Sequence, residues 1–257
     1  MEKVAGASWR LIVTGASSGI GEAIAARFAT AGWDVTNLSR RPCPVEGVKS
    51  KKVDMSDPSD TERVCDEVAK ELDAATSASS QLDQSRLCIV HNAASQPVDS
   101  MADPRRRAED MQKELNIQVV SPSLLTSRLS PHLQAWKGGS SVIYIGSTLS
   151  EKAVPNKALY STCKHAMVGM MRATVQDFFG KGVHTALVCP GFTETPLLVN
   201  ALKDADASGE LEKRLLSNVS FGRMVKPEEI ASVVEFVANN PATNGTILHA
   251  NLGQLEY

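Results

Sequence analysis

The feature that most constrains the fold of this chain is the repeated alternation of short aliphatic segments with longer segments of helical periodicity. Seven segments have the length and β-branched composition of strands: 9–14, 34–39, 48–54, 86–91, 141–146, 183–189 and 246–251. Between the first two, Ile20, Ile24 and Phe28 recur at helical spacing, and Gly32 follows as a C-cap. The alternation predicts βαβ units, and therefore an α/β fold with a doubly wound parallel sheet of about seven strands and helices on both faces.

The composition restricts the class of protein and its partners. The chain has 257 residues, a formal net charge of −2 and no segment of linker composition, so we expect a single domain over residues 1–257. The charge gives no reason to expect nucleic acid or an anionic membrane as a partner, and no apolar segment approaches the roughly 20 residues that span a bilayer. The five cysteines are scattered without a C-x-x-C pair, which favours reduced thiols, no metal site and a cytoplasmic location.

Two segments depart from the alternation of strands and helices. Residues 75–85 are small and polar, and we expect them to form a surface loop ahead of the fourth strand. Residues 198–222 have helical propensity but are interrupted at Ser208–Gly209. Because they follow a Pro-Gly pair, we expect residues 194–222 to form a lid over a substrate pocket.

A glycine-rich loop, TGASSGIG (14–21), connects the first strand to the helix that follows it. Its glycines have the spacing G-x-x-x-G-x-G. Residues without a Cβ atom let the backbone turn sharply and approach a pyrophosphate, whose charge then meets the helix N-terminus. The loop therefore predicts dinucleotide binding on a Rossmann-type sheet, with contacts from Gly15, Ser17, Ser18, Gly19, Ile20 and Gly21.

The end of the second strand predicts which dinucleotide binds. NAD-binding units usually place an acidic residue there to hold the ribose 2′-hydroxyl. This chain has Ser39, Arg40 and Arg41 at that end, whereas Asp34 begins the strand and lies at its opposite end. Guanidinium groups beside a hydroxyl would bind a 2′-phosphate, which a carboxylate would repel. We therefore predict NADP(H) as the cofactor.

Three polar residues are spaced to act on a carbonyl group. Ser147 follows the fifth strand, at the carboxyl edge of the sheet where open α/β folds bind their ligands. Tyr160 comes later, and Lys164 lies one helical turn beyond it, so the phenol and the ammonium share one helix face. This spacing alone would also fit an ordinary exposed pair, and Ser147 alone would also fit a simple strand end.

The ordered series of motifs resembles the short-chain dehydrogenase/reductase family in its compact, single-domain, NADP(H)-preferring form, and nearly the whole chain fits. TGASSGIG is similar to the family's cofactor loop, and Ser147, Tyr160 and Lys164 are similar to its catalytic set. The resemblance implies that Asn116 completes a catalytic tetrad by holding a water that connects Lys164 to solvent, and that the active assembly is a homotetramer or homodimer. It also implies cofactor contacts from Asp54 near the adenine, Asn92 and Ala93 of HNAA, Tyr160 and Lys164 at the nicotinamide end, and Pro190, Gly191, Thr193 and Thr195 of CPGFTET.

The chemistry expected of this set is proton transfer coupled to hydride transfer. A carbonyl carbon that receives a hydride becomes an alkoxide, which must gain a proton. A free phenol has a pKa of about 10, and a nearby ammonium lowers it. We expect Tyr160 to be the general acid in reduction and the general base in oxidation, with Lys164 lowering its pKa. Ser147 would donate a hydrogen bond to the carbonyl oxygen.

These expectations predict an NADPH-dependent oxidoreductase, a carbonyl reductase for a small ketone, aldehyde or secondary alcohol. The alternative is reduction of a 3-oxoacyl-[acyl-carrier-protein], whose acidic carrier needs basic residues near the pocket; Lys137 and Lys181 are candidates. A non-catalytic NADP(H)-binding sensor is a third hypothesis, which the presence of Tyr160 and Lys164 disfavours. Two departures from the family pattern, HNAA at 91–94 and ANLGQ at 250–254, remove no reacting group.

Overall fold

The protein is built on one parallel sheet. The computed structural model describes residues 6–79 and 81–255, and within them seven strands follow the order β3-β2-β1-β4-β5-β6-β7. The strands are β1 (Trp9–Thr14), β2 (Asp34–Ser39), β3 (Lys49–Lys52), β4 (Arg86–His91), β5 (Ser140–Ile145), β6 (Val183–Pro190) and β7 (Ile247–Ala250). The predicted Rossmann-type sheet is confirmed. Because β1 lies between β2 and β4, the chain reverses direction across the sheet there, which opens a crevice at the carboxyl ends of these strands.

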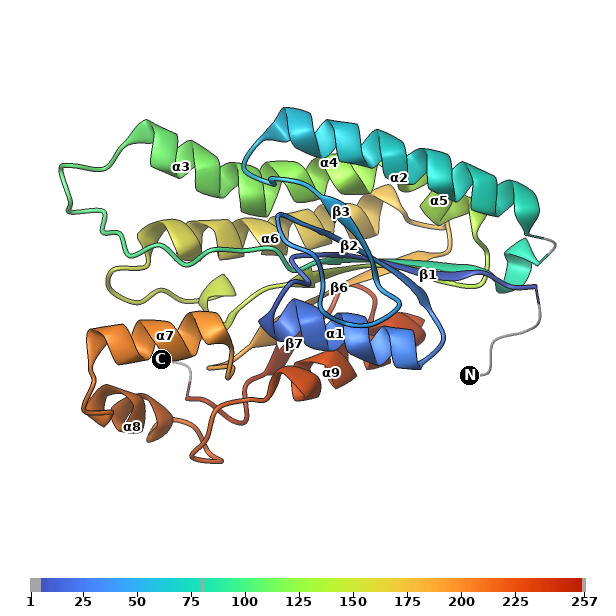
Figure 1. Cartoon of the computed structure of the whole chain (residues 1–257). Coiled ribbons are helices and arrows are strands. Elements are labelled where there is room, and N and C mark those ends of the chain that lie inside the picture. The colour runs from blue at the N-terminus through green and yellow to red at the C-terminus, as the bar shows by residue number, and fades with distance from the viewer. Residues whose placement is uncertain (1–5, 80, 256–257) are drawn as a thin grey trace.

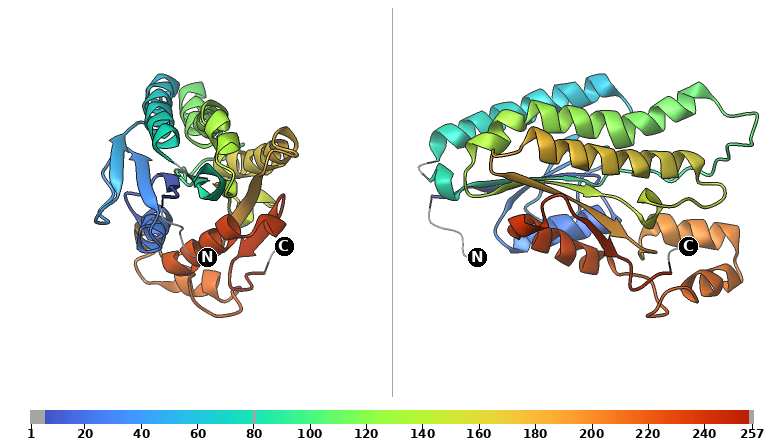
Figure 2. Two further views of the ribbon diagram at one scale, coloured as in Figure 1. Left: turned by 90° about the vertical axis from the view of Figure 1, so that its right-hand side faces the viewer. Right: turned by 180° about the vertical axis from the view of Figure 1, so that it is seen from behind.

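Helices cover both faces of this sheet (Figures 1 and 2). On one face lie α1 (Gly19–Thr30) and α9 (Pro227–Asn239); on the other lie α2 (Pro58–Ala78), α4 (Ser121–Arg128), α5 (Ser130–Ala135) and α6 (Ala158–Asp177). Helix α3 (Ala108–Leu115) leads into α4 through the π-helical turn η2 (Asn116–Val120). Helices α7 (Pro196–Ala205) and α8 (Glu210–Leu216) project beyond the carboxyl ends of the strands. Short 3₁₀ turns are η1 (Leu82–Gln84), η3 (Thr148–Ser150) and η4 (Pro241–Thr243).

Alternate residues of each strand pack on opposite faces, so two cores form. Leu11 and Val13 pack with Ile24 and Phe28 of α1 and with α9, whereas Ile12 packs in the core shared with α2, α4 and α6. All these side chains are buried. A sheet buried on both faces needs near-continuous apolar strands, which explains the apolar runs within β1, β4, β5 and β6.

The structure departs from the sequence expectations in two places. Helix α2 continues to Ala78, through the first part of the expected surface loop, because Thr76 accepts a hydrogen bond from the Trp136 indole at 2.8 Å and Ala75 packs on the core. Strand β3 is shorter than predicted, since it is an edge strand that pairs only with β2. Asp54 therefore lies in the turn after it. The expected break at Gly209 is present, with a left-handed φ of +78°.

Neither a membrane span nor a metal cluster is found in the described part of the chain. None of its helices is both long enough and apolar enough to cross a membrane. These residues also contain no group of three or more His, Cys, Asp or Glu side chains that could hold a metal ion. The cysteine thiols are all free, and burial is the largest cause of a raised pKa at each: Cys43, Cys65, Cys88, Cys163 and Cys189.

Candidate active site

The glycine loop forms a cradle that side chains would fill. A Cβ atom on Gly21 would lie 2.4 Å from the carbonyl oxygen of Gly15 and 2.5 Å from Nδ2 of Asn92, so only glycine fits. Gly15 and Gly19 have φ of +73° and +61°, which favour glycine as well. Helix α1 begins at Gly19, and its N-cap, Ser18, makes no side-chain capping hydrogen bond. The first-turn N–H groups are therefore available to an anion, which fits a pyrophosphate.

Asn92 and Ala93, which are predicted to contact the cofactor, lie against this loop. The Thr14 hydroxyl accepts hydrogen bonds from the backbone N–H groups of Asn92 and Ala93, both at 2.9 Å. The Asn92 amide donates to the carbonyl oxygens of Thr14 and Gly15 at 2.9 and 3.2 Å. These bonds join the ends of β1 and β4. Ala94, where the family usually has glycine, is exposed.

His91, the other departure in HNAA, is a core residue. Its ring is buried, stacks on Tyr144 with centroids 5.0 Å apart, and makes a 2.8 Å hydrogen bond through Nε2 with the Thr126 hydroxyl. Burial lowers the pKa of His91 to about 3, so the ring is neutral at physiological pH. His91 therefore contributes packing beneath the site and does not reach the cofactor cradle.

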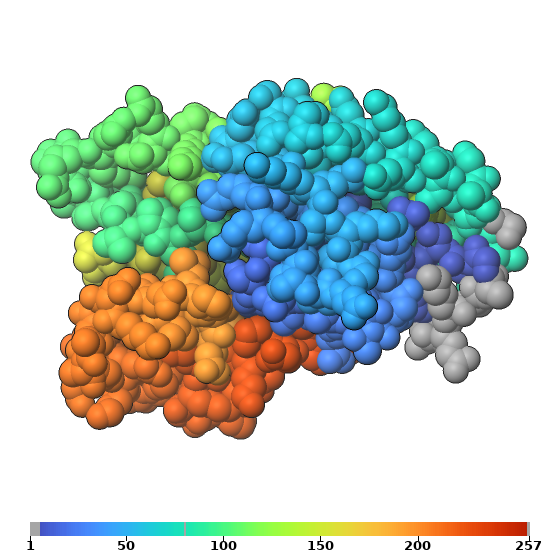
Figure 3. All heavy atoms as spheres, in the orientation of Figure 1, coloured from blue at the N-terminus to red at the C-terminus, as the bar shows by residue number. Residues whose placement is uncertain are grey.

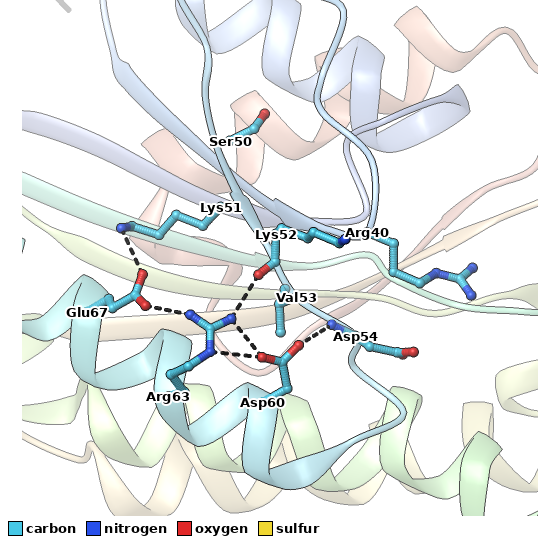
Figure 4. Close-up of a pocket in the computed structure, with 9 residues that line it drawn as sticks. All are labelled: Arg40, Ser50, Lys51, Lys52, Val53, Asp54, Asp60, Arg63 and Glu67. Atoms are coloured by element: carbon cyan, nitrogen blue, oxygen red, sulfur yellow. Dashed lines mark hydrogen bonds and ion pairs between the residues drawn. The ribbon is translucent and has the colours of Figure 1, made fainter.

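The arginines predicted to select the cofactor lie in an exposed turn after β2. Arg40 lines a surface pocket with residues of β3 and α2 (Figure 4): Ser50, Lys51, Lys52, Val53, Asp54, Asp60, Arg63 and Glu67. Arg63 is paired with Asp60 and Glu67. Within the described residues, Arg40 and Lys52 form no ion pair. Lys52 was not predicted from the sequence, and it lies at this edge because it pairs in register with Ser39.

Two other predicted residues of this region make local hydrogen bonds. The Ser39 hydroxyl donates to the carbonyl oxygen of Arg41 at 2.5 Å, so its hydrogen is already used. Asp54 accepts from the N–H and hydroxyl of Ser56 at 2.9 and 2.8 Å. The Ser56 N–H is the main cause that lowers the pKa of Asp54, which is therefore ionised beside the pocket.

Ser147 and Tyr160 meet at the carboxyl edge of the sheet. Ser147 follows β5 as the N-cap of η3, where its oxygen accepts the N–H of Leu149 at 3.1 Å. Ser147 also lies near enough to the Tyr160 phenol, in the first turn of α6, to lower the pKa of that phenol. The phenol is buried, and burial raises the pKa of Tyr160 to about 12, while Ser147 and Gln96 act in the opposite direction.

Lys164 lies beneath Tyr160, as the helical spacing predicted. Its side chain is 2% exposed, and Nζ lies 5.4 Å from the centre of the Tyr160 ring. Nζ donates to the carbonyl oxygen of Ile145 at 2.8 Å, and burial lowers the pKa of Lys164 to about 8. We expected the ammonium to make the phenol more acidic. In this structure burial dominates at both groups, and the pKa of the phenol is raised.

The Asn116 side chain is hydrogen-bonded to Gln112 and Ser56, and the water expected between Asn116 and Lys164 stays a prediction. Asn116 begins the π-helical turn η2, where its amide donates to the carbonyl oxygen of Ser56 at 2.8 Å and accepts from the Gln112 amide at 2.8 Å. The side chain thus contacts the turn after β3, and no bond to Lys164 is present. The π-helical turn itself is a local widening of the kind that often occurs at functional sites.

Gln96 is the site residue that the sequence did not suggest. Its amide Nε2 donates to the Tyr160 phenol oxygen at 3.5 Å. The loop that carries it is fixed to α6, because Lys157 Nζ donates to the carbonyl oxygen of Gln96 at 3.1 Å and Asp99 accepts the N–H of Leu159 at 2.9 Å. Only the general rule that ligands bind at the carboxyl edge could have drawn attention to a residue so soon after β4.

The segment that follows β6, residues 191–195, lies beside the glycine loop. A Cβ on Gly191 would lie 2.9 Å from Cα of Asn251, which explains the glycine after Pro190. Thr193 donates to the carbonyl oxygen of Gly191 at 3.0 Å. Thr195 caps α7 by accepting the N–H of Leu198 at 3.3 Å, and its methyl carbon would be 3.1 Å from a Cβ on Gly19. The start of α7 therefore touches the glycine loop.

The known proteins that this chain resembles are oxidoreductases, and they match nearly its whole length. A sequence family described as enoyl-(acyl carrier protein) reductase matches residues 15–254. An uncharacterized oxidoreductase of Thermotoga maritima is 26% identical over 95% of this chain and 96% of its own length. The human 3-oxoacyl-[acyl-carrier-protein] reductase is 28% identical over 92% of this chain and 93% of its own length.

Solved structures share the fold at lower identity. A short-chain dehydrogenase from Burkholderia cenocepacia in complex with NADP superposes with a TM-score of 0.77 at 24% identity, over 98% of this chain and 99% of that one. A 3-ketoacyl-(acyl-carrier-protein) reductase from Brucella melitensis complexed with NADH gives a TM-score of 0.76 at 22% identity, over 97% and 99% of the two chains.

Proposed function

The chain belongs to the short-chain dehydrogenase/reductase family of NAD(P)-dependent oxidoreductases, and on that premise we propose that it is an NADPH-dependent reductase of a small carbonyl compound. The observation that carries the proposal is the arrangement around one oxygen atom. The Tyr160 phenol accepts a hydrogen bond from the Gln96 amide at 3.5 Å, and Ser147 lies near enough to lower the pKa of the phenol, at the carboxyl edge of the sheet.

Each residue of the site has a separate role in carbonyl reduction. When bound, the nicotinamide cofactor supplies the hydride. Ser147 donates a hydrogen bond to the substrate oxygen, where negative charge grows. Tyr160 gives its proton to the same oxygen; with a pKa raised to about 12, the phenol carries that proton at neutral pH, as a general acid must. Lys164 and, by family resemblance, Asn116 support proton return to the phenol.

The charge at the end of β2 supports NADP(H). Related structures contain NADP in one case and NADH in another, so the fold does not decide between them. Here Arg40, Arg41 and Lys52 lie where an NAD-binding chain would carry a carboxylate, and all three are exposed. The Ser39 hydroxyl donates to the Arg41 carbonyl oxygen and would have to turn to donate to a 2′-phosphate.

We also propose a substrate lid, an oligomeric state and a cellular location for the enzyme. Figure 3 shows α7 and α8 (orange) as a projecting lobe at the end of the molecule that carries the candidate site. We propose that residues 194–222 close over the substrate and that the enzyme is a homodimer or homotetramer in the cytoplasm. The free thiols are consistent with a reducing compartment.

Reduction of a 3-oxoacyl-[acyl-carrier-protein] is the second candidate. It is supported by the name of the human relative. The lysines suggested for carrier docking do not support it: Lys137 and Lys181 precede β5 and β6, at the amino ends of strands, on the edge of the sheet opposite the site. The general carbonyl reductase therefore remains the better description.

The test is an NADPH-oxidation screen with ketones, quinones, aldehydes and acyl thioesters. We expect turnover with at least one class and loss of at least about a thousandfold in kcat in Tyr160→Phe, with NADPH affinity retained, because only the proton donor is removed. Folding of the variant is checked by its thermal midpoint. Turnover in Tyr160→Phe equal to that of the native chain would overturn the role of Tyr160 as the acid. Turnover of acyl thioesters alone by the native chain would favour the second candidate.

A further inference from the structure

A buried amide lies at the point where the cofactor cradle meets the arginine turn. Asn37 is in β2 and is fully buried, on the same face as Val35, among apolar residues of the α1 side. A buried amide is costly unless its hydrogen-bonding groups are satisfied. Asn37 was not predicted as a site residue, because it lies inside an otherwise ordinary strand.

The Asn37 amide bonds to both cofactor-facing loops. Its Oδ1 accepts the backbone N–H of Ala16, in the glycine loop, at 2.9 Å. Its Nδ2 donates to the Ser39 hydroxyl at 3.0 Å, to the carbonyl oxygen of Arg41 at 3.3 Å and to the Ser50 hydroxyl at 3.2 Å. A single side chain therefore connects the pyrophosphate cradle, the turn after β2, and β3.

The orientation of this amide is fixed by its backbone partners. The Ala16 N–H can only donate and the Arg41 carbonyl can only accept, so oxygen must face the glycine loop and nitrogen must face the arginine turn. Ser50 strengthens the second half, because its hydroxyl also accepts the N–H of Cys43 at 2.9 Å. The turn from Ser39 to Cys43 is thus held at both ends of the arginine pair.

We propose that Asn37 is a positioning residue that determines cofactor specificity by fixing the backbone from which Arg40 and Arg41 reach a 2′-phosphate. The inference rests on the proposed NADP(H) preference. Arg40 and Arg41 are exposed and have long, flexible side chains, so what the fold can define for them is the position of their backbone. A group that holds the arginine turn should matter for the 2′-phosphate more than for the pyrophosphate.

Asn37→Asp separates the two halves of the network. The aspartate retains an acceptor for the Ala16 N–H, but its second oxygen faces three groups that are hydrogen-bond acceptors in the native chain. The bond to the Arg41 carbonyl oxygen is lost, and the Ser39 and Ser50 hydroxyls must turn to donate to the carboxylate, while the glycine loop keeps its own bond. Because the aspartate also brings negative charge toward the proposed 2′-phosphate site, the neutral variant Ser50→Ala separates lost positioning from charge repulsion. We expect NADP⁺ to bind about tenfold more weakly and NAD⁺ to change by less than about threefold, since each lost bond contributes modestly.

The experiment measures NADP⁺ and NAD⁺ binding to the full chain by titration calorimetry, together with the thermal midpoint. Val35→Ala is the matched control, because it removes buried volume from the same strand face without touching either loop. It should lower the midpoint and leave the NADP⁺/NAD⁺ affinity ratio unchanged. Ser50→Ala changes an exposed residue of an edge strand, so it should fold normally and lower the ratio about threefold.

The outcomes separate this inference from the proposed cofactor. A native preference for NADP⁺ that falls in Asn37→Asp and Ser50→Ala, but not in Val35→Ala, supports both. A native preference that survives in both network variants overturns the role of Asn37 alone. Equal or tighter native binding of NAD⁺ overturns the cofactor proposal and the inference with it. If Asn37→Asp does not fold, Ser50→Ala decides.

Discussion

At the scale of single residues, Tyr160 experiences two opposing influences. Burial raises the pKa of its phenol to about 12, while Ser147 and Gln96 lower it. The stacked arrangement with Lys164 was expected from helical spacing, but its effect on acidity depends on how much water is removed from both groups. Desolvation of this kind depends on the packing of distant segments, so the sequence could not reveal it.

The contact between Gln96 and the phenol leads to a prediction. Gln96→Leu removes the amide donor while preserving approximate volume, and we expect kcat to fall about tenfold because charge on the phenol oxygen is less stabilised. NADPH affinity should be unchanged. Steady-state kinetics with each variant measure both.

Gln134→Leu is the control for this change. Gln134 also makes one side-chain hydrogen bond, to the carbonyl oxygen of Ser130 at 3.1 Å, but it lies on α5 at the opposite edge of the sheet. Its replacement should leave kcat at the native value. If Gln96→Leu matched the control, Gln96 would have no part in the reaction.

At the scale of structural elements, the β1–α1 unit depends on the absence of a side chain at residue 21. Gly21→Ala would place a methyl group within 2.4 Å of the Gly15 carbonyl oxygen and 2.5 Å of the Asn92 amide. The loop must shift, and we expect nucleotide affinity to fall by at least about tenfold. Fluorescence titration with NADPH measures the loss.

Gly169→Ala on α6 is the matched control for this glycine. A Cβ there would meet nothing within 4 Å, and Gly169 is in a helix, so alanine should stabilise the fold by up to about 1 kcal/mol without changing nucleotide affinity. Native affinity in Gly21→Ala would mean that the loop is not the cofactor cradle.

The elements also show what a sequence can and cannot predict. Strands β1, β2, β4 and β6 begin at the residues where the predicted strand segments begin. Their apolar runs indicate directly that a strand is buried on both faces. The predicted length of edge strand β3 was too great, because its Lys-rich residues pair with a neighbouring strand on one side only. The π-helical turn at Asn116 was not anticipated. It arises where α3 leads into α4, a tertiary constraint that helical propensity does not encode.

At the scale of the whole molecule, the buried ring of His91 couples stability to pH. Its pKa of about 3 in the folded chain lies below the usual value of about 6.5 for the unfolded chain. Between these values only the unfolded chain binds the proton, so this contribution to the free energy of unfolding increases as pH rises. At pH 5 it is lower than at pH 7 by about 2 kcal/mol.

His91→Asn should reduce this dependence. We expect the difference in unfolding free energy between pH 5 and pH 7 to shrink by about 2 kcal/mol relative to the native chain, although the variant is less stable overall because it leaves a cavity beside Tyr144. Urea denaturation at the two pH values tests this. An unchanged pH dependence would show that His91 is accessible to protons in the folded state.

The overall fold could be predicted from the sequence more completely than the side-chain directions in the candidate site. The doubly wound parallel sheet and the placement of the glycine loop, Ser147 and Tyr160 at its carboxyl edge follow from the alternation of strands and helices and from the carboxyl-edge rule. The directions of the Asn116, Ser39 and Gln96 side chains do not, because each is set by a hydrogen bond to a residue distant in the fold or by a local turn. The positions of Ser147, Tyr160 and Lys164 could be predicted, whereas Gln96, Lys52 and the bonding within the site could not.

The free thiols have a practical consequence for measurement. Since burial raises the pKa of every one of the five cysteines, few thiolates exist at neutral pH and the native chain should react slowly with maleimides. Glu212 on α8 is exposed, and Glu212→Cys would add one reactive thiol to an almost silent background. A fluorophore attached there would report directly whether α7 and α8 move when nucleotide and carbonyl compound are added.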